Sequence, residues 1–279
     1  MASQSVNKSP LGNPVMESHC PLCDAGLPTT QSGFSALLYC GTCANAVTRP
    51  APSVGVLLQD DLLQAYRGQS LSLRPLWQRQ ARLRMEWTHL YQSEGAILEV
   101  GCGTGEFLAV ALADGREVYG LEASESGFRH ARQLNVELVQ GGMQQAMERY
   151  ADFEFDSVVL WDSLGYFPDP LEVLRGCRQL LGRRGRLFLE VPNCASDNAL
   201  RLSAGWPHAQ LDQRYCHFTQ PGLVYLMAAA GFNLDVLLTF SDRIYCDPGR
   251  WKQLKNQALL AGHPWPSQEW IRVVASPAV

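Results

Sequence analysis

The chain has 279 residues, a formal net charge of −4 and 46% hydrophobic residues. Its length allows one full hydrophobic core and a small additional unit, and its composition is that of a globular protein. The slightly acidic balance argues against nucleic acid or an anionic membrane as a partner, and no stretch reaches the roughly 18 apolar residues of a membrane-spanning helix.

Residues 1–18 are polar, contain Pro10 and Pro14, and lack the apolar run of a signal peptide. We expect a disordered leader there. The chain has nine cysteines, but the five outside the N-terminal region are scattered singly, which does not fit a secreted disulfide scaffold. The expected environment is therefore reducing and cytoplasmic.

Two Cys-x-x-Cys motifs follow the leader, and together they contain Cys20, Cys23, Cys40 and Cys43. Their spacing is that of a structural zinc site, in which four thiolates complete a tetrahedron and leave no open position for chemistry. A redox or disulfide pair and an iron site are the alternatives. Residues 19–58 are predicted to form a zinc-ribbon domain, because so short a segment has too few apolar side chains to fold without a metal.

Residues 59–95 are predicted to be a helical linker that covers the ligand site. Within them, Leu76, Leu83, Trp87 and Leu90 lie at steps of 7, 4 and 3, which is one stripe of a helix. The arginines of this segment lie off the stripe. We expect them on a solvated face, although a basic helix could also meet an acidic partner.

A strand, a tight turn and a helix are predicted around three closely spaced glycines, Gly101, Gly103 and Gly105. Residues 96–100 form a strand-like run, and the residues after the last glycine are apolar at helical spacing. A dinucleotide fingerprint would need a glycine where Glu106 stands, and this carboxylate would repel a pyrophosphate. The loop alone would also suit a tight turn in another α/β protein.

Glu99 followed by Gly-x-Gly-x-Gly resembles motif I of the class I methyltransferases that use S-adenosylmethionine. The resemblance implies an α/β, Rossmann-like sheet of seven strands with an antiparallel last hairpin, over residues 96–279. It also places Glu99 near the methionine amino group of the cofactor. The cofactor's ribose and methionine portions would lie over the loop residues Gly101, Cys102, Gly103 and Gly105.

The N-terminal region extends this resemblance. Many bacterial small-molecule methyltransferases open with a Cys-x-x-Cys ribbon, a proline-containing exit and a segment that ends in tyrosine, as residues 20–66 do. The resemblance thus implies a class I methyltransferase with an N-terminal four-cysteine zinc ribbon.

Further cofactor contacts are expected at the ends of the next two strands. Glu122 ends the second strand, where a carboxylate can accept hydrogen bonds from both ribose hydroxyls, and Ala123 follows it. A surface glutamate at a helix start is the alternative. The acidic residue usual in the family after the third strand is missing, so Gly142 and Met143 are assigned to the adenine.

The fourth strand ends at Trp161 and Asp162, both assigned to the cofactor site. An Asp169-Pro170 pair then predicts a helix start, with Asp169 as the N-cap. Many relatives carry a His and then Glu-His in this region, whereas this chain has Asp162, Gly165 and Tyr166. The roles of those family residues therefore do not carry over.

The long connection 194–218 is aromatic and lies at the predicted carboxyl edge of the sheet, which suits a substrate cover. His217 and His208 are the first and second candidates for a general base, and Asp162 is placed to orient the cofactor or the acceptor. Packed or solvent-facing histidines are the alternative. Residues 242–269 are predicted to be an insertion within the terminal hairpin, serving as packing, a substrate wall or a dimer surface.

The predicted function is transfer of a methyl group from S-adenosylmethionine to oxygen or nitrogen of a small molecule, such as a secondary metabolite or a sugar-like acceptor. Two alternatives stay open. One is a ribosomal RNA base methyltransferase, for which the local arginines at 74–84 and 183–186 are the only basic excess. The other is a non-catalytic cofactor-binding protein whose ribbon docks a partner. The oligomeric state is left open.

Overall fold

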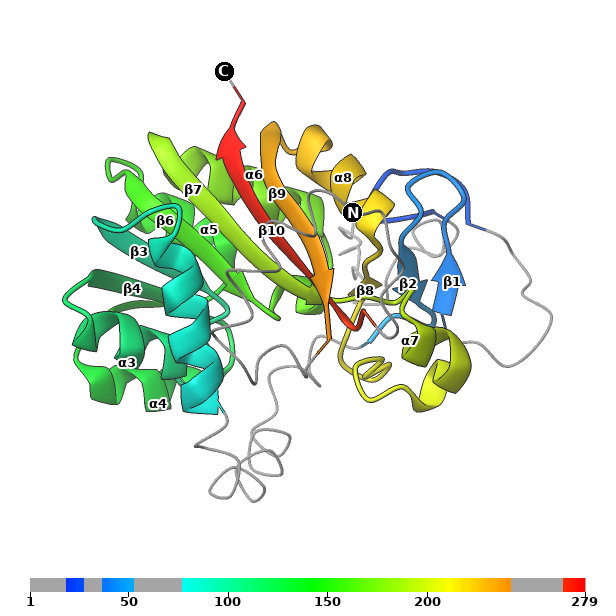
Figure 1. Cartoon of the computed structure of the whole chain (residues 1–279), viewed down its shortest axis with the longest axis horizontal. Helices are drawn as coiled ribbons and strands as arrows, with labels where there is room; N and C mark the ends of the chain where they lie inside the picture. The colour runs from blue at the N-terminus through cyan, green and yellow to red at the C-terminus, as the bar shows by residue number, and fades with distance from the viewer. Residues whose placement is uncertain (1–18, 28–36, 53–76, 242–267, 279) are drawn as a thin grey trace, which may run out of the picture.

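The computed structural model describes residues 19–27, 37–52, 77–241 and 268–278 (Figure 1). The predicted leader, the exit segment with residues 53–76, and most of the predicted insertion lie outside the described residues. The described part forms a three-layer α/β arrangement, with a seven-stranded sheet between two layers of helices.

The large sheet has the strand order β5-β4-β3-β6-β7-β10-β9. Its first five strands are parallel, whereas β10 is antiparallel to both of its neighbours. This confirms the predicted seven strands and the antiparallel last hairpin. The strands are β3 (Ala96–Val100), β4 (Glu117–Glu122), β5 (Glu137–Gln140), β6 (Phe155–Trp161), β7 (Leu181–Pro192), β9 (Phe232–Phe240) and β10 (Trp270–Pro277).

The central strands are apolar because both of their faces are covered by helices. One face carries residues 77–89, which are helical as predicted, with α3 (Glu106–Ala113) and α4 (Glu125–Ala131). In Figure 1 the helix of residues 77–89 (cyan) crosses in front of the sheet, while α5 and α6 lie behind it. The other face carries α5 (Met143–Arg149), α6 (Pro170–Leu180) and α8 (Gln220–Ala229).

The start of α6 follows the predicted capping chemistry. Asp169 is its N-cap, and the Asp169 carboxylate accepts a hydrogen bond from the backbone N–H of Glu172 at 2.9 Å. Pro170 occupies the first turn, where its missing N–H costs nothing. This cap fixes where the chain turns after β6, and so fixes the loop that leaves the carboxyl edge of the sheet.

A second, three-stranded sheet joins the N-terminal cysteines to the rest of the molecule. Its strands are β1 (Leu37–Tyr39), β2 (Ala46–Thr48) and β8 (Cys216–His217), paired antiparallel in the order β1-β2-β8. Because β8 belongs to the connection between β7 and α8, the predicted ribbon domain contains a strand that sequence reasoning did not assign to it. We call residues 19–27 and 37–48 the cysteine unit.

The cysteine unit shares one hydrophobic core with the large sheet. Leu22 and Val47 are fully buried in the same cluster as Phe218 and Leu223, which lie beside and within α8. Figure 1 shows the unit (blue) beside α8 and α7 (Asp197–Leu202). The unit is therefore built into the fold rather than tethered to it.

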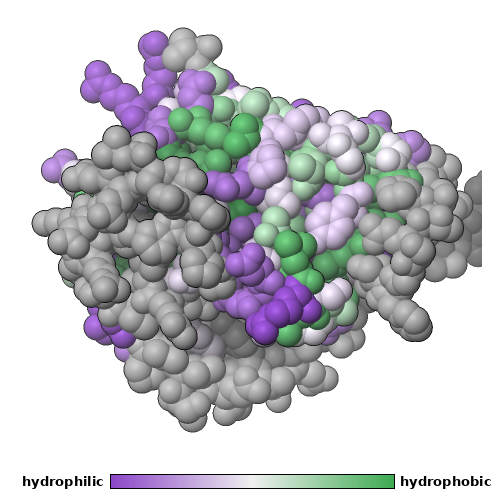
Figure 2. Space-filling model, turned by 45° about the vertical axis from the view of Figure 1, so that its right-hand side comes forward, coloured by the Kyte–Doolittle hydropathy of each residue, from purple (hydrophilic) through white to green (hydrophobic). Residues whose placement is uncertain are grey.

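The face of the molecule seen in Figure 2 carries both hydrophobic and hydrophilic residues. Figure 2 shows small hydrophobic and hydrophilic patches alternating over the described part of the face. Across the described ranges, no helix combines the length and the apolar character needed to cross a membrane.

Candidate functional site

The glycine loop between β3 and α3 leaves room for a ligand. Gly101, Gly103 and Gly105 all have positive φ, at 76°, 55° and 87°. A Cβ at Gly101 would lie 2.6 Å from the Cβ of Ser163, so that position has no space for a side chain. A Cβ at Gly103 would meet nothing within 4 Å, so the loop faces open space there.

Glu122 ties the glycine loop to the end of β4. One carboxylate oxygen accepts a hydrogen bond from the Gly103 N–H at 2.7 Å, and the other accepts from the N–H and the hydroxyl of Ser124. A carboxylate offers about four lone-pair sites, so Glu122 retains capacity for a further donor. Ala123, the next residue, is exposed beside it.

Glu99, the penultimate residue of β3, is a buried carboxyl with one oxygen that has no partner among the described residues. Its side chain is 4% exposed, and its Oε2 has no hydrogen-bond partner among the described residues. Burial raises the pKa of this carboxyl well above its ordinary value of 4.5, against the opposing effect of Arg84. A buried polar atom without a partner is rare, and this one fits a ligand that brings a cationic donor.

If Glu99 pairs with the ammonium group of S-adenosylmethionine, as the sequence predicts, then binding of the demethylated product S-adenosylhomocysteine should strengthen as the pH rises through the raised pKa of Glu99, because the ionised carboxylate is the form that pairs with a cation. The ligand-free protein should behave oppositely. Its folded state binds the Glu99 proton more tightly than its unfolded state, so the free energy of unfolding falls as the pH rises above 4.5.

Isothermal titration at several pH values measures this effect. Glu99→Gln should weaken binding by about 10-fold at high pH, as expected for a hydrogen bond to a charged group, and should flatten the pH dependence. Equal pH profiles for the wild type and Glu99→Gln would contradict the assignment.

The carboxyl end of β6 carries a polar network centred on Arg214. The Arg214 guanidinium donates to the Asp162 carboxylate at 2.8 Å and to the Tyr166 hydroxyl at 3.0 Å, and it lies over the Tyr166 ring. Its Nε also donates to Gln210 at 3.2 Å. The Asp162 side chain remains 29% exposed, so its carboxylate is accessible to an acceptor.

Trp161 lies beside this network, at the buried end of β6. Its ring packs against Phe107 and Phe188, and its indole N–H has no hydrogen-bond partner among the described residues. The same face of the sheet holds Glu99, so two incompletely satisfied polar groups are buried near the glycine loop.

Sequence reasoning missed a buried ion triad next to Trp161. Glu190 of β7 accepts hydrogen bonds from Arg84 of the helix at 77–89 and from Arg272 of β10. The prediction that Arg84 lies on a solvated face is therefore wrong: its side chain is 15% exposed and its guanidinium also faces the Trp161 ring. Of the predicted stripe, Trp87 is buried and Leu83 is partly buried, whereas Leu90 is 48% exposed and Leu76 lies outside the described residues. The apolar spacing therefore indicated the helix but not which side of it faces the buried Glu190 carboxylate.

Met143, assigned to the adenine from the sequence, is a buried residue at the start of α5. Its side chain packs against α6, where a Cβ at Gly176 would lie 2.3 Å from the Met143 Cγ. Gly142 is the N-cap residue of α5, and its N–H donates to the Gln145 side chain. An adenine contact from this loop would therefore come from backbone atoms, and the assignment stays a prediction.

The two candidate histidines have different surroundings. His217 is 3% exposed, and its Nε2 lies 2.8 Å from the Thr48 hydroxyl across the small sheet. Burial, with a contribution from Arg214, lowers the pKa of His217 to about 3. His208 lies edge-on between the rings of Trp206 and Trp270. These surroundings favour packing roles, and a catalytic role for either histidine remains a prediction.

The four N-terminal cysteines come together in a cluster whose sulfur atoms all lie within 4.8 Å of one another. The two motifs fold alike: the N–H groups of Asp24 and Ala44 donate to the carbonyls of Cys20 and Cys40 at 2.8 and 3.0 Å. A hydrogen bond with Cys20 lowers the pKa of the Cys43 thiol to about 5. Sulfur separations of 3.5 and 3.7 Å match the edge of a tetrahedron with metal–sulfur bonds of about 2.3 Å.

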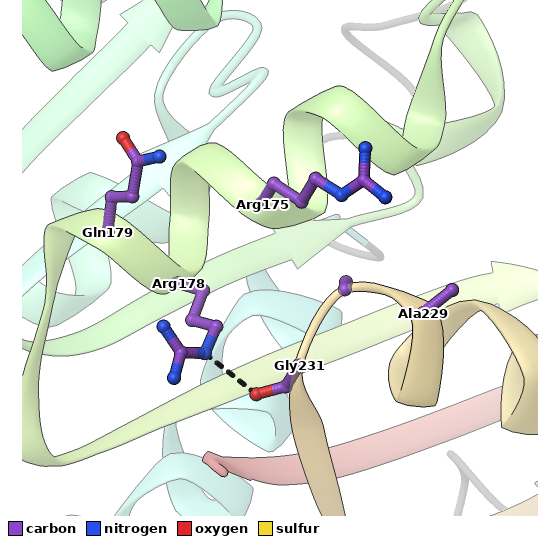
Figure 3. Close-up of a pocket in the computed structure, with 6 residues that line it drawn as sticks. Arg175, Arg178, Gln179, Ala229 and Gly231 are labelled. Atoms are coloured by element: carbon purple, nitrogen blue, oxygen red, sulfur yellow. Dashed lines mark hydrogen bonds between the residues drawn. The ribbon is translucent and has the colours of Figure 1, made fainter. Parts of the chain in front are cut away.

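A separate pocket of about 310 Å³ lies between α6 and the end of α8 (Figure 3). Arg178 closes one side by donating to the Gly231 carbonyl at 2.8 Å, while Arg175 is exposed at the other. Because α6 leads into the amino end of β7, this pocket lies at the opposite edge of the sheet from the glycine loop. It is not part of the candidate site.

Taken together, the strand order, the glycine loop and the acidic strand ends define a Rossmann-like fold of the class I methyltransferase type. A family model described as a methyltransferase domain matches residues 75–237, which is more than half of the chain. The chain belongs to this methyltransferase-domain family.

Solved structures share the fold at low identity. A possible histamine N-methyltransferase from Thermotoga maritima superposes with a TM-score of 0.55 and 18% identity, over 81% of this chain and 100% of that chain. The plantazolicin methyltransferase BpumL, solved in complex with SAH, gives a TM-score of 0.56 and 16% identity, over 79% of this chain and 91% of that chain.

Sequence relatives are ubiquinone biosynthesis O-methyltransferases. The protein from Stutzerimonas stutzeri is 30% identical over 122 residues, which are 40% of this chain and 51% of that protein. The protein from Erwinia tasmaniensis is 26% identical over 132 residues, which are 44% of this chain and 54% of that protein. The chain thus spans about half the length of the curated relatives it matches.

Proposed function

We propose that this protein transfers a methyl group from S-adenosylmethionine to a hydroxyl or amine of a small-molecule acceptor. The observation that carries the proposal is the Oε2 of Glu99, which has no hydrogen-bond partner within the described part of the chain and is buried near the end of β3 next to the open glycine loop. A buried carboxyl and an acidic second strand end suit a ligand with an ammonium group and ribose hydroxyls, and no phosphate.

The cofactor-binding residues follow from this placement. The glycine loop, with Gly101, Cys102, Gly103 and Gly105, gives the ligand close access to the backbone, Glu99 pairs with its ammonium group, and Glu122 accepts from its ribose. Ala123, Gly142, Met143, Trp161 and Asp162 remain proposed neighbours of the same ligand. When bound, S-adenosylmethionine supplies a methyl group on a positive sulfur, which a nucleophile displaces in line.

The chain's own contribution is to position the acceptor. The Asp162 carboxylate is held by Arg214 and remains partly exposed, so it can accept a hydrogen bond from an acceptor hydroxyl or amine. That hydrogen bond orients the nucleophile, and the Asp162 carboxylate can accept the proton that the nucleophile loses. The names of the ubiquinone biosynthesis relatives support oxygen as the methylated atom.

We also propose that Cys20, Cys23, Cys40 and Cys43 hold one structural zinc ion, as their cluster geometry supports. The purified full chain should contain about one zinc per molecule by elemental analysis, since four thiolates complete a zinc tetrahedron. Cys40→Ser should lower the zinc content, whereas Cys177→Ala, a change at a buried cysteine of α6, should retain it. A zinc-free wild type that keeps its fold would refute this part.

The function is tested by incubating the protein with methyl-labelled S-adenosylmethionine and a host extract, and then separating small molecules, RNA and protein. Label in the small-molecule fraction supports the proposal and identifies the acceptor. Label confined to RNA would replace it with a ribosomal RNA methyltransferase. Confirmed cofactor binding with no label in any fraction would favour a non-catalytic binding protein.

A further inference from the structure

The network around Arg214 is attached to the cysteine unit by consecutive backbone hydrogen bonds. The Thr48 N–H of β2 donates to the Tyr215 carbonyl at 2.9 Å, and the Tyr215 N–H donates to the Gly165 carbonyl at 2.9 Å. Gly165 lies three residues after Asp162, at the carboxyl end of β6. The cysteine unit thus reaches the edge of the sheet where the acceptor is proposed to bind.

Both ends of this connection are tightly fixed. On the cysteine side, the Asn45 side chain accepts from the Thr219 N–H at 3.1 Å, and its amide lies 3.8 Å from the Cys43 sulfur. The Thr219 hydroxyl donates to the Ala44 carbonyl at 2.8 Å. The second Cys-x-x-Cys motif therefore holds the chain directly after β8, while β2 holds β8 itself.

On the side of the large sheet, Arg214 has almost no freedom to move. Its side chain is 2% exposed, and a Cβ at Gly165 would lie 3.0 Å from its Nη1 and 2.8 Å from the Cys216 carbonyl oxygen. Because glycine has no side chain, the Arg214 guanidinium and β8 can occupy the space beside Gly165. The direction of the Arg214 fork is thus set by its neighbours.

Asp162 is the residue on which this network acts. Its φ is 63°, a left-handed conformation that costs a non-glycine residue free energy and persists where the surroundings enforce it. The Asp162 N–H donates to the Glu190 carbonyl at 2.8 Å, and Arg214 holds its Oδ1 at 2.8 Å. The exposed remainder of the carboxylate is therefore presented in one fixed direction.

We propose that Arg214 is a positioning residue that orients Asp162 toward the acceptor, and that the metal-loaded cysteine unit keeps Arg214 in place through β2 and β8. The proposal rests on the proposed function for what Asp162 contacts. It gives the N-terminal cysteines a part in acceptor binding without placing them in the chemistry.

The structural half is tested by hydrogen exchange on the full chain, zinc-loaded and metal-stripped. Stripping should reduce the protection of the Tyr215 amide and of residues 162–166 by at least about 10-fold, because their anchor is lost. Residues 101–105 should keep their protection. Unchanged exchange at 162–166 would overturn the proposal, and this measurement needs no acceptor.

If metal removal unfolds the whole chain, the Thr48→Val variant of the zinc-loaded protein is compared with the zinc-loaded wild type instead. This variant removes the hydroxyl that contacts His217 while keeping the shape of the side chain. It should raise exchange at Tyr215 and at 162–166, and Thr48→Ser should restore protection. Equal exchange in Thr48→Val and the wild type would overturn the link through β8.

The functional half is tested with Arg214→Met and Arg214→Lys, using the acceptor fraction labelled by the wild type. Arg214→Met should raise the acceptor KM about 10-fold or more, as for loss of a hydrogen bond to a charged group. In Arg214→Lys the acceptor KM should rise less than in Arg214→Met, because the lysine keeps a positive charge. The affinity for S-adenosylhomocysteine should change much less than the acceptor KM, and the thiolate absorption of the cobalt-substituted protein should not change, which a merely structural role would not predict.

The matched control is Arg175→Met, a change at an exposed arginine of the distant α6 pocket, which should transfer label at the wild-type rate. Normal acceptor kinetics in Arg214→Met, or a parallel loss of S-adenosylhomocysteine binding, would overturn the positioning role. A wild type that transfers no label would instead refute the proposed function, and the hydrogen-exchange result would still decide the link to the cysteine unit.

Discussion

Replacing Gly101 by arginine is expected to reduce the affinity for S-adenosylhomocysteine by about 100-fold or more. The residue has a φ of 76°, and its Cβ would lie 2.6 Å from the Ser163 Cβ. The left-handed backbone costs about 1–2 kcal/mol and the overpacking about 1–3 kcal/mol. Moving the loop relieves this strain at the expense of the binding site, and about 3 kcal/mol corresponds to roughly 100-fold in affinity.

Substitutions at two other glycines distinguish the effect of backbone strain from the effect of contact with the ligand. Gly115 has a φ of 83° and open space around its Cβ position, so Gly115→Ala should cost about 1 kcal/mol of stability and leave the affinity unchanged. Gly103→Ala also meets no protein atom within 4 Å, yet it should weaken binding if the ligand fills that space as proposed. Titration calorimetry and thermal unfolding measure both effects. A folded Gly101→Arg protein with normal affinity would refute the loop assignment.

Glu190→Gln is expected to destabilise the fold by about 3–5 kcal/mol, the usual loss when one partner of a buried ion pair is removed. Glu190 is 1% exposed and compensates two arginines at once. Its replacement leaves Arg84 and Arg272 buried beside Trp161 without their carboxylate. Denaturant unfolding of the full chain measures the change.

The matched control for Glu190 is Glu125→Gln. Glu125 also pairs with an arginine, Arg129, at 2.6 Å, but both side chains are more than half exposed. This surface pair should contribute less than about 1 kcal/mol. Similar losses in the free energy of unfolding for the two variants would show that burial of the triad does not determine how much it stabilises the fold.

The sequence alone predicts those parts of the fold that depend on residues close together along the chain. The three glycines and Glu99 lie within seven consecutive positions, and the backbone conformation of the glycines follows from their lack of a side chain. The same holds for the two Cys-x-x-Cys motifs and for the Asp169-Pro170 helix start. The fold class and the cysteine cluster were predictable for this reason.

The remaining features depend on pairings between distant segments. Arg272 lies in an apolar strand and Arg84 lies off the predicted apolar stripe of a helix, and only the folded sheet brings both to Glu190. His217 reads as a loop histidine, but the two-residue strand β8 buries it. Neither arrangement has a local signal, because strand partners cannot be chosen from short sequence patterns.

The third strand of the small sheet, β8, lies far along the sequence from β1 and β2, and this affects synthesis of the chain. Thr48 and His217 are 169 positions apart, so at 5–20 residues per second roughly 10–30 s pass before the ribosome supplies the partner of β2. During that interval the N-terminal cysteines are already outside the ribosome without their third strand. A metal ion bound early would hold the two cysteine motifs together, and the nascent hairpin would await a docking partner that arrives only when the sheet is nearly complete.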